Sequence, residues 1–291
     1  METIGFIGIG RIGLPICKNL IDRGRTVVGY RRSSLDTFRQ VGGTPATSAA
    51  DVTRRSDVVF TCLPSDEALA DVVNGPNGIL AAVKPGQIVA EFGSHPVSVK
   101  EKYVGLFAGK QAIFLDGEVS GTPGMVEARK AAIYLAGDKN AAQAIEPIVA
   151  DFADVCLYLG AFGAATTVKL INNLLVGATI AGTAQAMAIG LKAGVDPALM
   201  IKAVAAGSGG ATQFNIRAPW MAERRFLPQQ GPVDQLLHYL DGAKGLADSV
   251  GVATPLLDCL IDLYRGALAQ IGERDVAAIV ETFENGGKPK T

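Results

Sequence analysis

The stretch TIGFIGIGRIG, residues 3–13, decides the fold, because its glycines at 8, 10 and 13 have the spacing GxGxxG. We predict a strand over Thr3–Ile9, a helix over Gly13–Arg23 and a second strand over Thr26–Tyr30. A lone GxGxxG is weak evidence and also fits a plain turn, but between a strand and a helix it is typical of dinucleotide binding. The glycines let the backbone approach a pyrophosphate, and the helix N-terminus offers N–H donors and partial positive charge. The expected cofactor-binding residues of this turn are Gly8, Ile9, Gly10, Arg11, Ile12 and Gly13.

The end of the second strand indicates which dinucleotide is bound. NAD sites usually carry an acidic residue there, which bonds the ribose hydroxyls. This chain has Arg31, Arg32 and Ser33, and its first acid, Asp36, lies too far along. Two guanidinium groups and a hydroxyl suit a 2′-phosphate, so we expect NADP, with NAD possible. The alternative is a solvated basic pair, since residues 54–55 and 224–225 are also arginine pairs.

The chain changes character near residue 163. Before it, short apolar runs alternate with helical stretches, which predicts an α/β domain over 1–162 with a Rossmann-type parallel sheet. After it, long Ala- and Leu-rich stretches predict an all-α domain over 163–291 that begins with one helix over 164–193. The expected strands after the first two are 57–63, 87–91, 112–115, 132–136 and 154–159, and the later helices are 197–206, 213–223, 233–250, 255–270 and 275–283.

Composition excludes several classes of protein. The 291 residues carry 27 Lys and Arg against 28 Asp and Glu, so no basic surplus exists to neutralise a nucleic acid. Four scattered cysteines and two histidines form no metal-type cluster, so no metal is expected, and the thiols fit a reducing cytoplasm. Residues 170–191 lack charge and are long enough to span a bilayer, but polar residues interrupt them, so we expect a buried helix and no membrane.

Four segments, in order, resemble the β-hydroxyacid dehydrogenase family over essentially the whole chain. They are GFIGIGRIG at residues 5–13 with Lys18-Asn19-Leu20, then DGEVSGT at 116–122, then Gly160 through Gly163 to KLINN at 169–173, and last Gly207-Ser208-Gly209 with GVATPL at 251–256. The resemblance implies hydride transfer between NADP(H) and a small, carboxylate-bearing 3-hydroxyacid or its semialdehyde. It also implies a homodimer or homotetramer joined through the helical domain.

The same resemblance assigns roles to single residues. Lys169 is the expected general acid/base and Asn173 its helper, and i, i+4 spacing places the two on one helix face. Partial desolvation beside the uncharged stretch would lower the pKa of Lys169 toward a usable value. Ser120, Gly121 and Thr122 are the expected substrate-binding residues. Ser94, Leu63, Pro64 and His238 are expected near the cofactor.

Several positions depart from the family's pattern. Glu118 and Thr122 stand where a proline and a second glycine are usual, and a carboxylate at 118 would repel an anionic substrate unless it points away. His238-Tyr239 replaces a Lys-Asp pair, and Ala165 replaces a glycine. His95 follows Ser94 where an apolar residue is usual. Two alternatives stay open: an imine reductase on the same scaffold, although Lys169 disfavours it, and a non-catalytic NADP-binding sensor.

Overall fold

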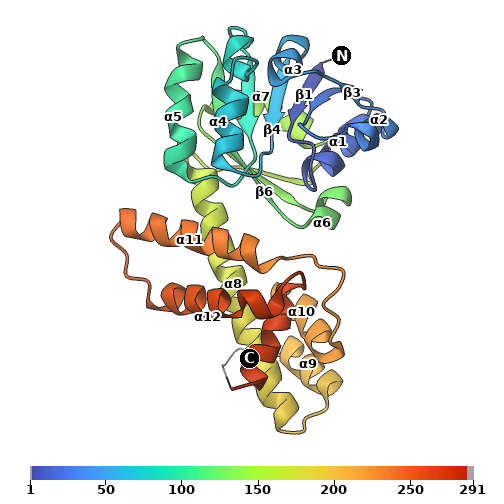
Figure 1. The fold of residues 1–291 in the computed structure, drawn as a ribbon, viewed down its shortest axis with the longest axis vertical. Coiled ribbons are helices and arrows are strands. Elements are labelled where there is room, and N and C mark those ends of the chain that lie inside the picture. Colours follow the sequence, from blue (N-terminus) through green and yellow to red (C-terminus); the bar gives the residue numbers. More distant parts are fainter. Residues whose placement is uncertain (1, 287–291) are drawn as a thin grey trace. The chain divides into compact units, whose positions relative to one another are not determined.

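The structure, a computed structural model, describes residues 2–286. The chain divides into a first unit that ends at Lys169 and a second that begins at Leu170. Figure 1 shows a sheet flanked by helices in the first unit and helices alone in the described part of the second. This division into an α/β part and a helical part agrees with the predicted fold class.

The first unit is built on an eight-stranded sheet of order β3-β2-β1-β4-β5-β6-β7-β8. The strands are β1 Thr3–Ile7, β2 Thr26–Tyr30, β3 Thr44–Pro45, β4 Val58–Thr61, β5 Ile88–Glu91, β6 Ile113–Ser120, β7 Ala132–Ala136 and β8 Val155–Tyr158. The helices are α1 Gly13–Asp22, α2 Asp36–Gln40, α3 Ala49–Arg55, α4 Asp66–Asn74, α5 Val97–Ala108, α6 Pro123–Glu127 and α7 Lys139–Val149, with a 3-10 turn at Ile79–Ala81. Strands such as β4 are buried throughout, as expected when helices cover both faces.

The sheet departs from the predicted parallel arrangement at one pair. β6 and β7 are antiparallel, with Asp116 opposite Ala136 and Ser120 opposite Ala132. Their connection, residues 121–131, holds only the five-residue helix α6, which is too short to carry the chain back across the sheet for a parallel return. This pairing also makes β6 longer than predicted: the expected strand ended at Leu115, whereas β6 continues to Ser120. The motif at 116–120 is therefore a strand and not a loop.

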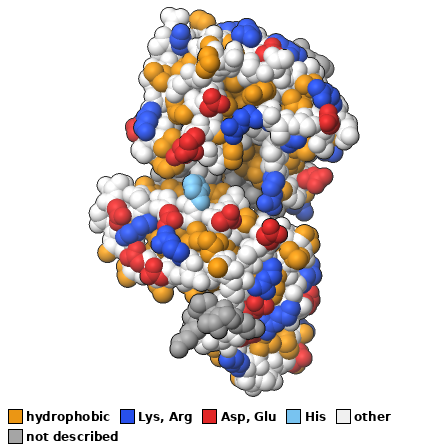
Figure 2. Space-filling model, viewed as in Figure 1, with side chains coloured by type: hydrophobic (Ala, Val, Ile, Leu, Met, Phe, Trp, Pro, Cys, Tyr) orange, Lys and Arg blue, Asp and Glu red, His pale blue; other side chains and the backbone are white. Residues whose placement is uncertain are grey.

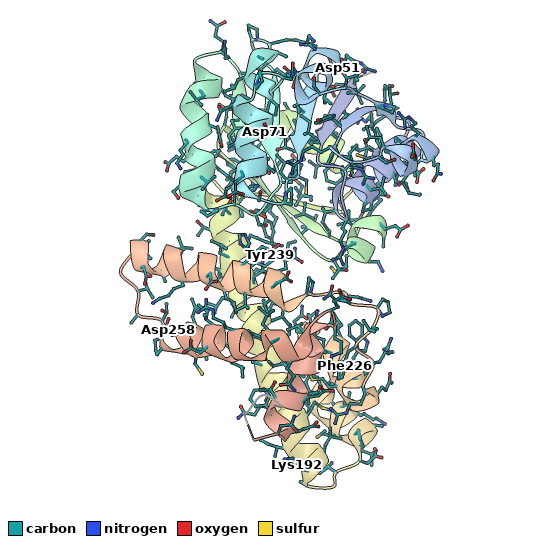
Figure 3. The ribbon with its side chains drawn as sticks, in the orientation of Figure 1. Asp51, Asp71, Lys192, Phe226, Tyr239 and Asp258 are labelled. Atoms are coloured by element: carbon teal, nitrogen blue, oxygen red, sulfur yellow. The ribbon has the colours of Figure 1, made fainter. Side chains whose placement is uncertain are left out.

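The second unit packs α8, which begins in the first unit, with four further long helices. The bounds are α8 Ala164–Lys192, α9 Pro197–Ala206, α10 Thr212–Glu223, α11 Val233–Ser249, α12 Pro255–Ile271 and α13 Val280–Glu284, with a 3-10 turn at Val276–Ile279. Lys192 ends α8, and Phe226 follows α10 (Figure 3). The buried hydroxyl of Tyr264 donates to the carbonyl of Gly177, 2.7 Å away, and so joins α12 to α8. These helices lie close to the predicted ranges.

Helix α8 has the length and hydropathy of a membrane span. Among the described residues it is the one helix that meets this criterion, with a mean hydropathy of 1.6 in its most apolar window, and 44% of that window is buried inside the protein. The core helix of a soluble protein passes the same test. Composition alone therefore does not make α8 a span.

Candidate active site

The glycine turn between β1 and α1 has a backbone that side chains would block. Gly8 has φ +98°, and a Cβ there would lie 2.2 Å from the carbonyl oxygen of Cys62. A Cβ on Gly13 would lie 2.3 Å from the carbonyl oxygen of Gly8. At Gly10, by contrast, a Cβ would meet nothing within 4 Å. The turn is thus tightly packed against the protein at Gly8 and Gly13 and open at Gly10. An open backbone at Gly10 is what the close approach of a ligand requires.

The N-terminus of α1 suits an anion. Its N-cap residue, Ile12, provides no side-chain cap, and no acidic residue lies in the first turn. The Leu14 N–H donates to the Gly10 carbonyl oxygen, 3.0 Å away, and Pro15 has no N–H, so the N–H groups that can meet a phosphate are those before Leu14. The positive end of the helix dipole adds to their attraction for an anion. Leu63 follows β4 and lies close to Gly8, within 3.2 Å of a Cβ built there, while Pro64 beside it is exposed. The N-terminus of α1 therefore suits the pyrophosphate of a dinucleotide.

The basic residues after β2 lie close to the turn. The Arg31 guanidinium donates to the carbonyl oxygen of Ile9, 2.9 Å away, and to that of Ser34. Arg32 and Ser33 are exposed. Asp36 is bound to Ser34 and Arg39, 2.6 and 2.9 Å away. One guanidinium is therefore held against the turn, and its neighbours are accessible to a ligand.

The expected substrate-binding residues follow one another at the end of β6. Ser120 is the last residue of the strand and is half-buried. Gly121 packs against Ala131, where a Cβ would come within 2.7 Å of the alanine methyl group. The Thr122 hydroxyl accepts from the N–H of Met125 and caps α6. Thr122 thus has a structural role of its own in addition to the expected one.

Lys169 reaches the same strand from α8. Its Nζ donates to the carbonyl oxygen of Val119, 2.6 Å away, and the side chain is buried. This bond places the amine beside the peptide that precedes Ser120. Burial lowers the pKa of Lys169, and the negative charge of Glu118 partly opposes that effect.

Asn173 lies one turn after Lys169 in the same helix. Its side chain is buried, and among the described residues its Nδ2 has no hydrogen-bond partner. A buried donor without an acceptor is costly unless a ligand or water completes it. An acceptor oxygen of a bound substrate would complete the hydrogen bonding of this Asn173 amide group.

Glu118 does not face solvent. The carboxylate is fully buried and accepts from the Ser94 hydroxyl, 2.7 Å away. On its other oxygen it meets Lys100 Nζ and Thr166 Oγ1, each 3.4 Å away. Glu118 is therefore buried inside the first unit, with the Lys100 ammonium beside it as an opposite charge.

Sequence reasoning missed the cluster that surrounds Glu118. Lys100 is fully buried in α5, and its ammonium lies 3.0 Å from Asp116, 3.1 Å from Glu91 and 3.4 Å from Glu118. Burial disfavours its charge, but the three carboxylates outweigh that effect and raise the pKa of Lys100. Two signals were available: alternate residues of β6 are acidic, and Lys100 lies in register with the buried Tyr103 and Phe107.

The two histidines of the chain have different surroundings. His95 is buried, with Nδ1 2.7 Å from Asp66 and Nε2 3.6 Å from Glu91. Burial opposes its charge, yet the Glu91 and Asp66 carboxylates together raise the pKa of His95. His238 is exposed on α11 in the second unit, and its ring packs beside Tyr239, labelled in Figure 3.

Lys244, also on α11, pairs with Asp248 at 3.1 Å and, at 3.2 Å, with Asp258 of α12, which Figure 3 labels. Among the described residues, no group of His, Cys, Asp and Glu side chains could hold a metal ion. On the face seen in Figure 2, acidic and basic side chains are interspersed over both units.

A glycine turn on a mostly parallel sheet, with an open helix N-terminus, defines a dinucleotide-binding domain. Residues 3–160 match the family model described as the NAD binding domain of 6-phosphogluconate dehydrogenase. Residues 163–283 match the one described as "NAD-binding of NADP-dependent 3-hydroxyisobutyrate dehydrogenase". The chain belongs to the β-hydroxyacid dehydrogenase family.

Relatives of known activity agree with this membership. The chain is 33% identical over 208 residues to the mitochondrial 3-hydroxyisobutyrate dehydrogenase of Rattus norvegicus. The matched residues make up 71% of this chain and 62% of the length of that protein. It is 32% identical over 230 residues to the L-threonate dehydrogenase of Cupriavidus necator, 78% of this chain and 77% of the relative.

Solved structures share the fold. The 3-hydroxyisobutyrate dehydrogenase of Mycobacterium tuberculosis matches with a TM-score of 0.88 at 23% identity, covering 97% of this chain and 99% of that one. An imine reductase from Myxococcus stipitatus matches with a TM-score of 0.66 at 18% identity, again over 97% and 99%. At these identities the likeness concerns the fold alone.

Proposed function

We propose that this chain is an oxidoreductase that transfers a hydride between NADP(H) and a small 3-hydroxyacid or its semialdehyde. The observation that carries the proposal is the buried amine of Lys169, bonded to the Val119 carbonyl beside Ser120 in the unit that contains the glycine turn. A lysine with a lowered pKa releases its proton more readily than an ordinary surface lysine, which is almost fully protonated near neutral pH.

Lys169 acts as a general acid in one direction and as a general base in the other. For reduction, its ammonium donates a proton to the carbonyl oxygen of the semialdehyde; for oxidation, its neutral amine accepts the proton of the hydroxyl. The nicotinamide, when bound, supplies the hydride chemistry. The Ser120 hydroxyl and the Gly121 N–H donate to the substrate carboxylate, and the Asn173 amide donates to substrate oxygen.

The preference for NADP rests on charge at the end of β2. Arg31 is held against the glycine turn by its bond to Ile9, and Arg32 and Ser33 are exposed beside it. Guanidinium groups favour a 2′-phosphate, and no carboxylate stands at the ribose position to repel it. Ser94, Leu63, Pro64 and His238 are the further residues that we assign to the cofactor.

Imine reduction is the second candidate. The shared fold with an imine reductase favours it, but a general acid/base lysine suits an alcohol or carbonyl oxygen better. A non-catalytic NADP sensor would need neither Lys169 nor Asn173. We further infer a cytoplasmic enzyme without membrane or nucleic-acid partners, a view supported by the balanced charge of the chain.

Replacing Lys169 tests the proposal. For Lys169→Ala we expect kcat/KM for semialdehyde reduction to fall at least about 1000-fold while NADPH still binds. The measurements are NADPH oxidation with a panel of semialdehydes and cyclic imines, and NADPH binding by fluorescence. Lys192→Ala, which changes the other lysine of α8, is the matched control and should keep full activity.

The panel separates the three candidate functions. Turnover of imines but not of semialdehydes would favour the imine reductase. NADPH binding without any turnover in the unaltered protein would favour the sensor. Full semialdehyde activity in Lys169→Ala would overturn the assignment of Lys169.

A further inference from the structure

The carboxylate of Glu118 has charged neighbours from two strands and two helices, and Tyr134 of β7 stands opposite Glu118 in the β6–β7 pair. Glu91 comes from β5, Asp116 from β6 itself and Lys100 from α5. Lys169 comes from α8: its Nζ is bonded to the carbonyl oxygen of Val119, the residue after Glu118, and Thr166, three residues earlier in α8, contacts the Glu118 carboxylate at 3.4 Å. Cys62 follows β4. Burial raises the pKa of its thiol to about 12, and the negative charges of Glu91 and Glu118 add to this effect, so the thiol stays neutral. His95 lies behind Glu91 and is paired with Asp66.

These charges do not balance. Three buried carboxylates face two ammonium groups, Lys100 and Lys169, and His95 lies between Glu91 and Asp66, so that four carboxylates meet at most three positive charges. A buried cluster with one surplus negative charge is costly, and it is relieved when one carboxylate takes up a proton.

Glu118 is the carboxylate suited to hold that proton. Its Oε1 lies 3.4 Å from Lys100, farther than the 3.0 and 3.1 Å that separate Lys100 from Asp116 and Glu91, so Lys100 stabilises the charge of Glu118 least. The bond that its Oε2 accepts from Ser94 favours the charged form and partly opposes this effect. Burial raises the pKa of Glu118 to about 7, although Lys100 and Lys169 favour its charge.

We propose that Glu118 is a positioning residue whose buried carboxylate is the counter-charge that keeps Lys169 in its ammonium form and decides at which pH Lys169 releases its proton. This inference rests on the proposed function, because it gives a partner to the proton donor proposed there. Lys100 supplies the fixed positive charge that lets a carboxylate ionise in this position.

The sign of the effect follows from the electrostatics. When Glu118 is ionised, its charge stabilises the Lys169 ammonium and raises the pH needed to form the amine. Glu118→Gln keeps the shape and most hydrogen bonds but removes the charge, so Lys169 should become the neutral amine at lower pH. We expect its titration midpoint to fall by about one pH unit, a tenfold change in the ratio of amine to ammonium.

The titration of Lys169 can be followed without any turnover. In protein labelled with [6-13C]lysine, the Lys169 Cε resonance is assigned with Lys169→Arg and followed by NMR from pH 6 to 11. Asp116→Asn is the matched control, since Asp116 belongs to the same buried cluster and also touches Lys100 and Thr166. A merely structural effect of losing a buried carboxylate would appear in both variants.

Three outcomes decide the proposal. A fall of about one unit in Glu118→Gln, with less than about 0.3 unit in Asp116→Asn, supports it. Equal shifts in both variants, or no shift in Glu118→Gln, overturn it. If Glu118→Gln fails to fold, the unaltered protein still answers: its Lys169 resonance should show a second step near pH 7 as Glu118 ionises, and a single step would contradict the proposal.

Activity then gives a separate measurement. In the reductive direction kcat/KM should fall as the pH rises through the Lys169 titration, and Glu118→Gln should move that limb about one unit lower. If Lys169→Ala keeps full activity while the NMR shift appears, the proposed function fails and the electrostatic pairing stands. If Lys169→Ala is inactive and the NMR shift is absent, the proposed function stands and the electrostatic pairing of Glu118 with Lys169 fails.

Discussion

Lys100 and Lys169 show how neighbours decide the chemistry of a buried ammonium group. Both side chains are buried in the first unit. Lys100 has three carboxylates within 3.4 Å, so its charge is held permanently. Lys169 has a carbonyl oxygen as its hydrogen-bond acceptor and feels Glu118 as an opposite charge, so burial dominates and its pKa falls. Of the two, Lys169 is therefore the lysine that releases its proton more readily.

The raised pKa of Glu118 predicts how stability depends on pH. Its pKa rises from 4.5 in the unfolded chain to about 7 in the folded one. The resulting stability is fully present below about pH 4.5 and is lost as the pH rises through 7, up to about 3 kcal/mol in all. Urea unfolding at pH 5 and pH 8 should therefore show a loss in the unaltered protein that Glu118→Gln does not share. Parallel curves for the two proteins would contradict the assignment.

The two arginines after β2 predict the cofactor preference. We expect Arg31→Asp combined with Arg32→Ala to raise the KM for NADP at least tenfold, about 1.4 kcal/mol of lost binding, without raising the KM for NAD. Steady-state kinetics with both cofactors measure this. Arg54→Ala with Arg55→Ala, an arginine pair on α3, is the control and should change neither value. An unchanged KM for NADP in the first variant would refute the assignment.

At the scale of elements, the turn between β1 and α1 contains glycines of two kinds: some are required by packing, and one is not. Gly8 and Gly13 are needed for packing, because a Cβ at either would meet backbone atoms at 2.2–2.3 Å. Gly10 meets nothing within 4 Å, so packing does not explain its lack of a side chain. Close approach of a ligand does explain it.

Gly10→Ala should therefore fold normally and bind NADPH poorly. We expect a thermal midpoint within about 2 °C of the unaltered protein, and a Kd for NADPH at least tenfold higher, which corresponds to about 1.4 kcal/mol. Gly105→Ala on α5, where a Cβ also meets nothing within 4 Å, is the control and should leave the Kd unchanged. Normal NADPH binding by Gly10→Ala would show that no ligand approaches the turn at this point.

The antiparallel extension of β6 builds the rest of the site. Because side chains alternate along a strand, Asp116, Glu118 and Ser120 share one face of β6. Pairing with β7 keeps this stretch straight to Ser120, and the first turns of α8 bring Thr166 and Lys169 to it. One strand thus carries both the buried carboxylates and the residues expected to bind substrate.

For the whole molecule, we propose that the second unit mediates assembly. Helix α9 has no buried residue, and exposed apolar side chains include Leu199 at 66%, Ile189 at 64% and Leu175 at 61%. Exposed apolar surface of this kind is typical of an interface between subunits. This supports the homodimer or homotetramer inferred from the family resemblance.

Charge on α9 should weaken that assembly. For Leu199→Glu we expect a shift toward monomer in sedimentation velocity at micromolar concentration. Leu106→Glu on α5 of the first unit, where the leucine is 47% exposed, should leave the assembly unchanged. A monomeric unaltered protein would contradict the proposal.

The sequence by itself determined the class of fold, because that class follows from local patterns. GxGxxG after an apolar run, the alternation of strands and helices up to residue 163, and the uncharged stretch after Lys169 are all periodic or short-range signals. The same signals predicted the glycine turn and the bounds of α8 to within a residue at each end. They also identified Lys169 as a lysine beside a desolvated helix.

Only the tertiary structure decided what surrounds Lys169. Glu118 and Lys100 are eighteen residues apart, and Asp116 meets Thr166 across fifty. Whether Glu118 points at substrate or into the protein depends on β6 pairing antiparallel to β7 and on Lys100 being buried beneath it. No local pattern encodes such partners, because the energy of a buried charge depends on which groups the whole fold brings within a few ångströms of it.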